Sequence, residues 1–357
     1  MAELLKNKYP LEVAKTIGGM IVKVYPEFDS TGFIKHVAKG YEQLELMDRG
    51  RKISAALKVF LPDNFKQAVT ILLASLDSPY EQDPENSLAS FIFMPHTMFV
   101  TENGLDDFDT SMAAHYQLTQ RFTSEFAIRP FIERYPEQSL GLLKQWAVDA
   151  NYHVRRLVSE GTRPKLPWAK SVTLTQDQTV PLLTQLHGDP TRYVTRSVAN
   201  HLNDIAKIDA DLVVELLKGW AKTGKQLPKE VEWMTRHGLR TLVKQGHAGA
   251  LDLLGFKADA PVQVTARMLT PSVKMGDAVS FEVDISAETT CPVLVAYRID
   301  FARADGKRAQ KVFKLKQGKV TPKAPLKMAK FSCGIHHPAN KLTIFLPGIC
   351  LLRHSPG

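Results

Sequence analysis

Arg156 and Glu160 stand four positions apart in the segment NYHVRRLVSEGTRPKLPW, residues 151–168. Residues at this spacing share one face of a helix. A carboxylate held there can stabilise positive charge that develops on a sugar, or position a water molecule. The same spacing is also typical of a solvated ion pair without chemistry. The residues around this pair are therefore needed to distinguish a catalytic carboxylate from a solvated ion pair.

The helix that carries this pair recurs 40 residues later. The first copy contains Asp149, His153, Val154, Arg156, Val158, Ser159 and Glu160, and the second contains Asp189, Tyr193, Val194, Arg196, Val198, Ala199 and Asn200. A repeat of about 40 residues built from helix pairs is typical of a HEAT-like solenoid, which leaves an extended surface for binding. Asp204 follows Asn200 by one turn. We therefore expect Arg156, Glu160, Asn200 and Asp204 to face one concave surface.

The loop after the first copy is stiff and basic. Residues 161–168, GTRPKLPW, contain two prolines, two cations and a tryptophan. Arg163 and Lys165 are suited to a phosphate, and Trp168 is suited to a base or a cation. A tryptophan that fills the gap between two repeats fits this composition equally well.

Helical periodicity extends from Leu11 to about Phe256, with turn residues at the breaks. The spacing predicts three helix pairs, and Asp189 before Pro190 predicts an N-cap with proline in the first turn. The pairs are residues 137–147 with 152–161, 178–186 with 191–205, and 211–222 with 230–245.

The pattern changes to alternation after residue 256. Val279, Phe281, Val283 and Ile285 alternate with polar neighbours, as do Val293, Val295, Tyr297, Ile299 and Phe301. The pair Asp305-Gly306 predicts a hairpin. Six or seven short strands fit an immunoglobulin-like sandwich. We expect a helical domain over residues 1–256 and a β domain over 257–357.

The net charge of +9 lies entirely in the β domain. Residues 1–256 hold 30 basic and 30 acidic residues, whereas residues 257–357 hold 16 and 7. Such a charge predicts binding to a polyanion, and nucleic acid is favoured over an anionic membrane. A basic surface that only increases solubility is the alternative. Nine cations and no acid lie within residues 307–330.

Other features narrow the class of protein. No apolar run of 18 residues and no secretory leader occur, so we expect a soluble cytoplasmic protein. Cys291, Cys333 and Cys350 are expected to be small core residues. Cys333, His336 and His337 lack a fourth metal ligand at suitable spacing, so neither a metal nor a cofactor is expected. The motifs of phosphate-binding loops, serine hydrolases and zinc proteases are absent.

The segments NYHVRRLVSEGTRPKLPWA and RYVTRSVANHLNDIAK resemble the AlkC branch of the bacterial AlkC/AlkD DNA glycosylases, and the resemblance spans both domains. It implies excision of cationic bases, namely N3-methylated adenine and also methylated cytosine, from double-stranded DNA without base flipping. It also implies that Glu160 and Asp204 are the active-site acids, with Asp209 and Asp211 as alternatives to Asp204. Glu125, Arg156 and Trp168 would line the lesion site.

Methylation at N3 makes adenine a cationic leaving group, so carboxylates that stabilise an oxocarbenium-like sugar suffice for the chemistry. The residues expected to contact DNA are Arg155, Arg163, Lys165, Arg192, Arg196, Asn200, Lys307, Arg308, Lys311, Lys314 and Lys316. We expect a monomer in the bacterial nucleoid, with no membrane partner. The alternative is a non-catalytic HEAT-like scaffold that binds nucleic acid or a protein.

Overall fold

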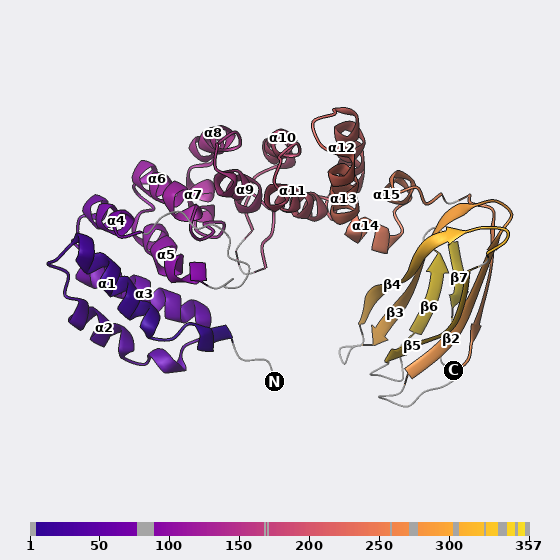
Figure 1. Cartoon of the computed structure of the whole chain (residues 1–357), viewed down its shortest axis with the longest axis horizontal. Coiled ribbons are helices and arrows are strands. Elements are labelled where there is room, and N and C mark those ends of the chain that lie inside the picture. Colours follow the sequence, from indigo (N-terminus) through magenta and orange to yellow (C-terminus); the bar gives the residue numbers. More distant parts are fainter. Residues whose placement is uncertain are drawn as a thin grey trace. The chain divides into compact units, whose positions relative to one another are not determined.

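The chain is helical up to Leu253 and consists of strands from Val262 onwards (Figure 1). The computed structural model describes residues 5–76, 89–167, 169, 171–257, 259–270, 278–302, 307–324, 326–334, 341–346 and 349–353. The predicted fold class, an all-α HEAT-like repeat array followed by an all-β immunoglobulin-like sandwich, is confirmed.

The chain divides into two units, residues 1–201 and 202–357. This division falls inside helix α11 (Arg192–Ile205), so each unit is described by itself. The predicted domain boundary at residues 256 and 257 stays a prediction.

The first unit is built from successive helices that pack side by side (Figure 1). Its core includes Ile17, Phe33, Leu57 and Phe99, all essentially inaccessible to solvent. Before α11 its elements are η1 (Leu5–Lys8), α1 (Glu12–Val24), α2 (Ser30–Ala38), η2 (Tyr41–Gln43), α3 (Leu46–Phe60), α4 (Phe65–Ala74), η3 (Ala89–Phe93), α5 (Met94–Asn103), α6 (Phe108–Thr119), α7 (Arg129–Arg134), α8 (Pro136–Trp146), α9 (Tyr152–Gly161) and α10 (Gln176–Leu186).

The repeat predicted from the sequence is present as α8 with α9 and α10 with α11. Val154 and Val158 of α9 and Val194 and Val198 of α11 are fully buried, as the apolar positions of the repeat predict. Gly161 ends α9 in close contact with Ile128, because an added Cβ would lie 2.4 Å from Cδ1 of Ile128 and would force that side chain to shift. Helix α9 therefore ends tightly packed against the segment before α7.

Two local predictions were wrong. Asp189 is not the N-cap of α11, because the helix begins at Arg192 and the Asp189 carboxylate accepts hydrogen bonds from the backbone and side chain of Thr191 in the preceding turn. The single helix predicted over residues 230–245 is two helices. It breaks at Leu239, which is fully buried, directly after Gly238, a residue that weakens a helix interior.

The second unit joins the last helices to the sandwich. Its helices after α11 are α12 (Ala210–Lys222), α13 (Pro228–Gly238), α14 (Arg240–Gln245) and α15 (Ala248–Leu253). Its strands are β1 (Val262–Met268), β2 (Ala278–Ala287), β3 (Cys291–Ala302), β4 (Arg308–Val320), β5 (Leu326–Gly334), β6 (Lys341–Leu346) and β7 (Ile349–Arg353).

The described strands form two antiparallel sheets, ordered β1-β2-β5 and β4-β3-β6-β7. Phe281, Ile285, Val293 and Tyr297 fill the space between them, which confirms the predicted alternation. The predicted hairpin partners β3 and β4 pair antiparallel, whereas the turn residues Asp305 and Gly306 lie outside the described residues.

The other face of β3 is covered as well. Leu294 and Ala296 point away from the core of the sandwich and are nevertheless buried, and α14 packs against the neighbouring strand β4. The sandwich and the last helices therefore share an interface within the second unit.

Candidate active site

The candidate site lies at the carboxyl end of α9. Asn151 caps this helix, because its side-chain oxygen accepts a hydrogen bond from the His153 backbone N–H at 2.8 Å. Ten residues of helix bring Arg156 and Glu160 onto one face, as the spacing predicts. Unlike a surface pair, this one is enclosed: the side chain of Glu160 is 7 % exposed and that of Arg156 is 17 % exposed.

Glu160 is held by three side chains. Arg163 contacts Oε1, the Ser197 hydroxyl donates to Oε2 at 2.6 Å, and Arg156 Nη2 lies 3.7 Å from Oε2. Burial opposes ionisation, but the two guanidinium groups and the hydrogen bonds outweigh it and lower the pKa of the Glu160 carboxyl below its ordinary value. Glu160 is therefore a buried carboxylate at neutral pH.

Glu125 joins the same network from the loop between α6 and α7. Its carboxylate contacts Arg156 Nη1 and accepts a hydrogen bond at 2.8 Å from the Thr123 hydroxyl, which in turn accepts one from Arg156 at 2.7 Å. The Arg156 guanidinium also lies 5.2 Å from the centre of the Tyr193 ring. Although burial opposes the charged form, Glu125 and the other neighbours raise the pKa of Arg156, so this residue stays cationic.

The site thus contains two carboxylates and two guanidinium groups close together. The formal charges of these four groups cancel. Each carboxylate is nevertheless fixed in direction by donors from several segments, as expected of a preorganised electrostatic site.

Arg129 at the start of α7 holds the loop that follows α9. Its guanidinium donates to the carbonyls of Gly161 at 3.1 Å, Arg163 at 2.9 Å and Pro164 at 3.5 Å. Leu166 is buried and Lys165 is exposed. Arg129 therefore fixes the position of the loop that the sequence predicts. This arginine was not identified from the sequence. Trp168 lies outside the described residues.

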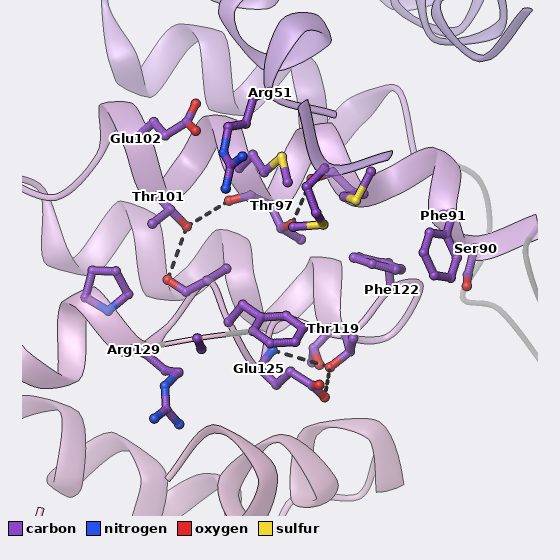
Figure 2. A pocket seen from close by; sticks show the side chains of 18 of the residues that line it. Arg51, Ser90, Phe91, Thr97, Thr101, Glu102, Thr119, Phe122, Glu125 and Arg129 are labelled. Carbon is purple, nitrogen blue, oxygen red and sulfur yellow. Dashed lines mark hydrogen bonds between the residues drawn. The ribbon is translucent and has the colours of Figure 1, made fainter. Parts of the chain in front are cut away.

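A cavity of about 1160 Å³ adjoins the network. Glu125, Thr123, His153 and Tyr193 line one part of it, and the remaining walls are largely apolar, with methionine and phenylalanine side chains. In Figure 2, Phe122 points towards Phe91, and Glu125 lies across the cavity from Arg51 and Glu102. Glu125 therefore has access to open space, whereas Glu160 is buried and is not among the residues that line the cavity.

Asn200 lies on α11 in the first unit, and Asp204 lies on the same helix in the second. The Asp204 carboxylate is buried and pairs with Lys207 at 2.8 Å. Of the two alternative acids, Asp209 caps α12 through the Leu212 backbone N–H, and Asp211 is exposed and lies 3.4 Å from His247. The convergence of Asp204 with Glu160 stays a prediction.

The cations predicted to contact DNA fall into two groups. Arg155 and Arg163 are engaged in enclosed ion pairs, with Asp189 and Glu160 respectively, so we leave both out of the proposed DNA surface. The exposed cations are Lys165, Arg192, Arg196, Lys307, Lys311, Lys314 and Lys316, while the Arg308 side chain lies outside the described residues.

The cysteine predictions concern the sandwich. Cys291 is a free, buried thiol, as a core residue should be. The side chains of Cys333 and Cys350 lie outside the described residues, as do His336 and His337. Within the described part of the chain, no group of three or more His, Cys, Asp or Glu residues is arranged to hold a metal ion.

The helical repeats, the enclosed carboxylate network on them and the C-terminal sandwich define a multidomain HEAT-like repeat protein. Residues 263–333 match the family model described as "Uncharacterised protein YhaZ, C-terminal Ig-like domain". The chain is 33% identical over 321 residues to "Uncharacterized protein YhaZ" of Bacillus subtilis (strain 168), which covers 88% of this chain and 86% of that protein.

A solved structure is similar along nearly the whole chain. It is Pseudomonas fluorescens alkylpurine DNA glycosylase AlkC bound to DNA containing an abasic site analog, at 31% identity and a TM-score of 0.85 over 98% of each chain. The chain belongs to the YhaZ family, within the AlkC branch of the AlkC/AlkD bacterial DNA alkylation repair glycosylases. Among the helices that the structure describes, none has the length and apolar character needed to cross a membrane.

Proposed function

We propose that this protein is a DNA glycosylase that hydrolyses the N-glycosidic bond of cationic N-methylated bases in duplex DNA without base flipping. The substrates are 3-methyladenine and 3-methylcytosine. The observation that carries the proposal is the enclosed Glu160 carboxylate, held by Ser197, Arg156 and Arg163. The likeness to AlkC over 98% of both chains supports the assignment.

The reaction does not need a general acid to protonate the leaving group, because a cationic methylated base already is a good leaving group. The bond between C1′ and the base nitrogen breaks, and its electron pair leaves with the base, which becomes neutral. The sugar acquires oxocarbenium character, which Glu160 stabilises. A water oxygen then bonds to C1′, and a carboxylate accepts the proton that this water loses.

Glu125 and Asp204 are the candidate partners of Glu160. Glu125 lines the cavity and is held by Thr123 and Arg156, and we expect it to contact the lesion or the water. Tyr193 lines the same cavity, and with Trp168 it would offer aromatic faces to a cationic base. The same carboxylates would thus favour binding of a cationic methylated base and stabilise the positive charge on the sugar.

DNA would be held by the exposed cations of two segments. Arg192 and Arg196 lie four residues apart on α11, and Lys311, Lys314 and Lys316 are exposed along β4. Because binding to phosphates releases counterions from DNA, the affinity should fall steeply with salt. We expect a monomer that acts on the DNA of the bacterial cytoplasm.

The decisive test is release of 3-methyladenine and 3-methylcytosine from alkylated duplex DNA under single-turnover conditions. We expect release by the wild-type protein, with or without a chelator, because carboxylate electrostatics need no Lewis acid. Glu160→Gln should abolish most of it, whereas Glu12→Gln, a change of an exposed glutamate on α1, should not. Binding of DNA without any release would leave the scaffold alternative.

A further inference from the structure

We infer that Ser197 is a positioning residue that fixes the direction of the Glu160 carboxylate through a buried chain of hydroxyl groups joining α9 and α11. The inference rests on the proposed function of Glu160 and extends it to a residue that never touches the substrate. Three observations, all within the first unit, carry it.

The first observation is the hydrogen bond from Ser197 to Glu160. Ser197 Oγ lies 2.6 Å from Glu160 Oε2 and 2.9 Å from Ser159 Oγ. A serine hydroxyl has one proton and two acceptor sites. Since a carboxylate can only accept, Ser197 gives its proton to Glu160 and accepts the proton of Ser159. The result is a chain of two hydroxyls in which each bond strengthens the next.

The second observation is the enclosure of this chain. Ser159 is fully buried, Ser197 is 2% exposed and Glu160 is 5% exposed. Water therefore has little access to Oε2, and no solvent molecule can easily replace the Ser197 hydroxyl if it is removed. Loss of a hydrogen-bond donor therefore destabilises the ionised carboxylate more in this buried site than it would in water.

The third observation is that α11 holds the same turn of α9 at a second point. His201 Nδ1 lies 3.0 Å from the Ser159 carbonyl oxygen, one of the terminal carbonyls that α9 leaves without an intrahelical partner. Ser197 and His201 are four residues apart and lie on one face of α11. This face fixes both the backbone and the side chain of the turn that carries Glu160.

The other charged and titratable groups around Glu160 act from different directions. Arg156, Arg163 and Arg129 favour its ionised form, and the nearby carboxylate of Glu125 contacts Arg156. His201 and Tyr193 face the turn from α11. Removing the Ser197 hydroxyl leaves all of these side chains in place, so its effect can be measured separately.

The experiment compares Ser197→Ala with Ser159→Ala and the wild type. The Glu160 carboxyl is followed by ¹³C NMR titration in protein with labelled glutamate, and its signal is identified by its absence in Glu160→Gln. Loss of one hydrogen bond to a charged group should raise the Glu160 pKa by about 1 unit in Ser197→Ala. Ser159→Ala should move it less, because Ser197 still donates to Glu160.

The second readout is the pH profile of single-turnover excision. Its acidic limb, which we expect below pH 5 in the wild type, should move upward by the same amount as the titration. The rate at pH 7.5 should fall several-fold because the carboxylate is less well oriented. Ser197→Cys, a near-isosteric change to a weaker donor, should give an intermediate shift, and it replaces Ser197→Ala if that protein fails to fold.

The outcomes separate the two hypotheses. A wild-type protein that releases no methylated base would overturn the proposed function, while the NMR titration would still decide the role of Ser197. An active wild type whose Glu160 titration and acidic limb are unchanged in Ser197→Ala and Ser197→Cys would overturn the inference. Equal shifts in Ser159→Ala and Ser197→Ala would also overturn it, because they would indicate altered packing and not the loss of one donor.

Discussion

Arg155 of α9 forms a two-point ion pair with Asp189 of the following repeat. Its Nε lies 2.5 Å from Oδ2 and its Nη2 lies 3.3 Å from Oδ1, while Nη1 donates to the carbonyls of Asp149 and Ala150. Asp149 occupies the equivalent place one repeat earlier and accepts a hydrogen bond from Tyr116 at 2.9 Å. In both copies of the repeat, an aspartate before the second helix thus joins that helix pair to the preceding segment.

The first prediction follows from this pair. The Asp189 side chain is 3% exposed and that of Arg155 is 14% exposed, so removing either partner leaves a charge poorly solvated. Arg155→Ala and Asp189→Asn should each lower the free energy of unfolding by about 3 kcal/mol, with strong coupling in the double variant. Lys165→Ala, at an exposed cation, should leave stability unchanged. Urea denaturation checks this, and additive effects would contradict it.

The second prediction concerns the acids. Glu160→Gln should lower single-turnover excision by about 10²-fold or more, the scale of losing one preorganised electrostatic group. Asp204→Asn should do the same if the 40-residue repeat places it on the same sugar. Circular dichroism should show unchanged helicity in both. A normal rate in Asp204→Asn alone would assign the second role to another acid, with Glu125 the next to test.

The fold was largely predictable from the sequence because its signals are local. The limits of α9 were predicted to the residue, since Asn151 caps the helix and Gly161 closes it. The error at Asp189 arose because an aspartate before a proline signals an N-cap, whereas here its side chain binds Thr191 and Arg155 before the helix begins.

The site was only partly predictable, because its interactions join distant segments. The spacing placed Arg156 and Glu160 together, and the family resemblance added Glu125. Thr123, Arg129 and Ser197 carry no motif, and their roles depend on which segments pack against α9. Among the site residues that were not assigned a role from the sequence, Tyr193 alone could have been found from the repeat, because it occupies the position that His153 has in the first copy.

The third prediction is the pH dependence of Glu160. Its folded-state pKa is lowered, so its ion pairs stabilise the protein above the ordinary value of 4.5 and are lost as the pH falls through the folded value. Excision should therefore show no acidic limb from Glu160 between pH 5 and 8. A limb near pH 6 that disappears in Glu160→Gln would show that burial and not the arginines controls this group.

The fourth prediction concerns two histidines of the core. His96 and His115 are fully buried, and no described group hydrogen-bonds to their ring nitrogens. Burial lowers the pKa of His96 to about 4 and that of His115 to about 3. The unfolded chain therefore binds protons that the folded protein does not, and each histidine should reduce stability by roughly 1.4 kcal/mol per pH unit below 6.5.

Thermal denaturation between pH 7.5 and 5 checks this loss. His115→Leu should weaken the pH dependence, and combination with His96→Leu should weaken it further. A wild-type protein that is equally stable at pH 7.5 and pH 5 would contradict the prediction.

The last prediction tests whether β4 binds DNA. Lys311, Lys314 and Lys316 are exposed on a strand at the edge of its sheet, where lysines also serve to prevent edge-to-edge association. If they bind phosphates, reversal of all three to Glu should lower duplex affinity at least tenfold. It should also flatten the slope of log K against log salt by about 0.9 for each phosphate that is no longer neutralised.

A net-charge control for the β4 variant is available on the N-terminal helices. The same reversal at the exposed residues Lys35, Lys39 and Lys58 changes the net charge of the protein equally, so a reduced affinity that both triple variants share would reflect overall charge and not β4. Substitution is also a cleaner test than truncation after residue 256, which would deprive α14 of the strand it packs against. The packing residues Phe313 and Leu315 remain in the reversed protein, so its sandwich should stay folded. An unchanged salt slope in the β4 variant would assign the lysines to protection of the sheet edge, and Arg192 and Arg196 of α11 would then be the next cations to test.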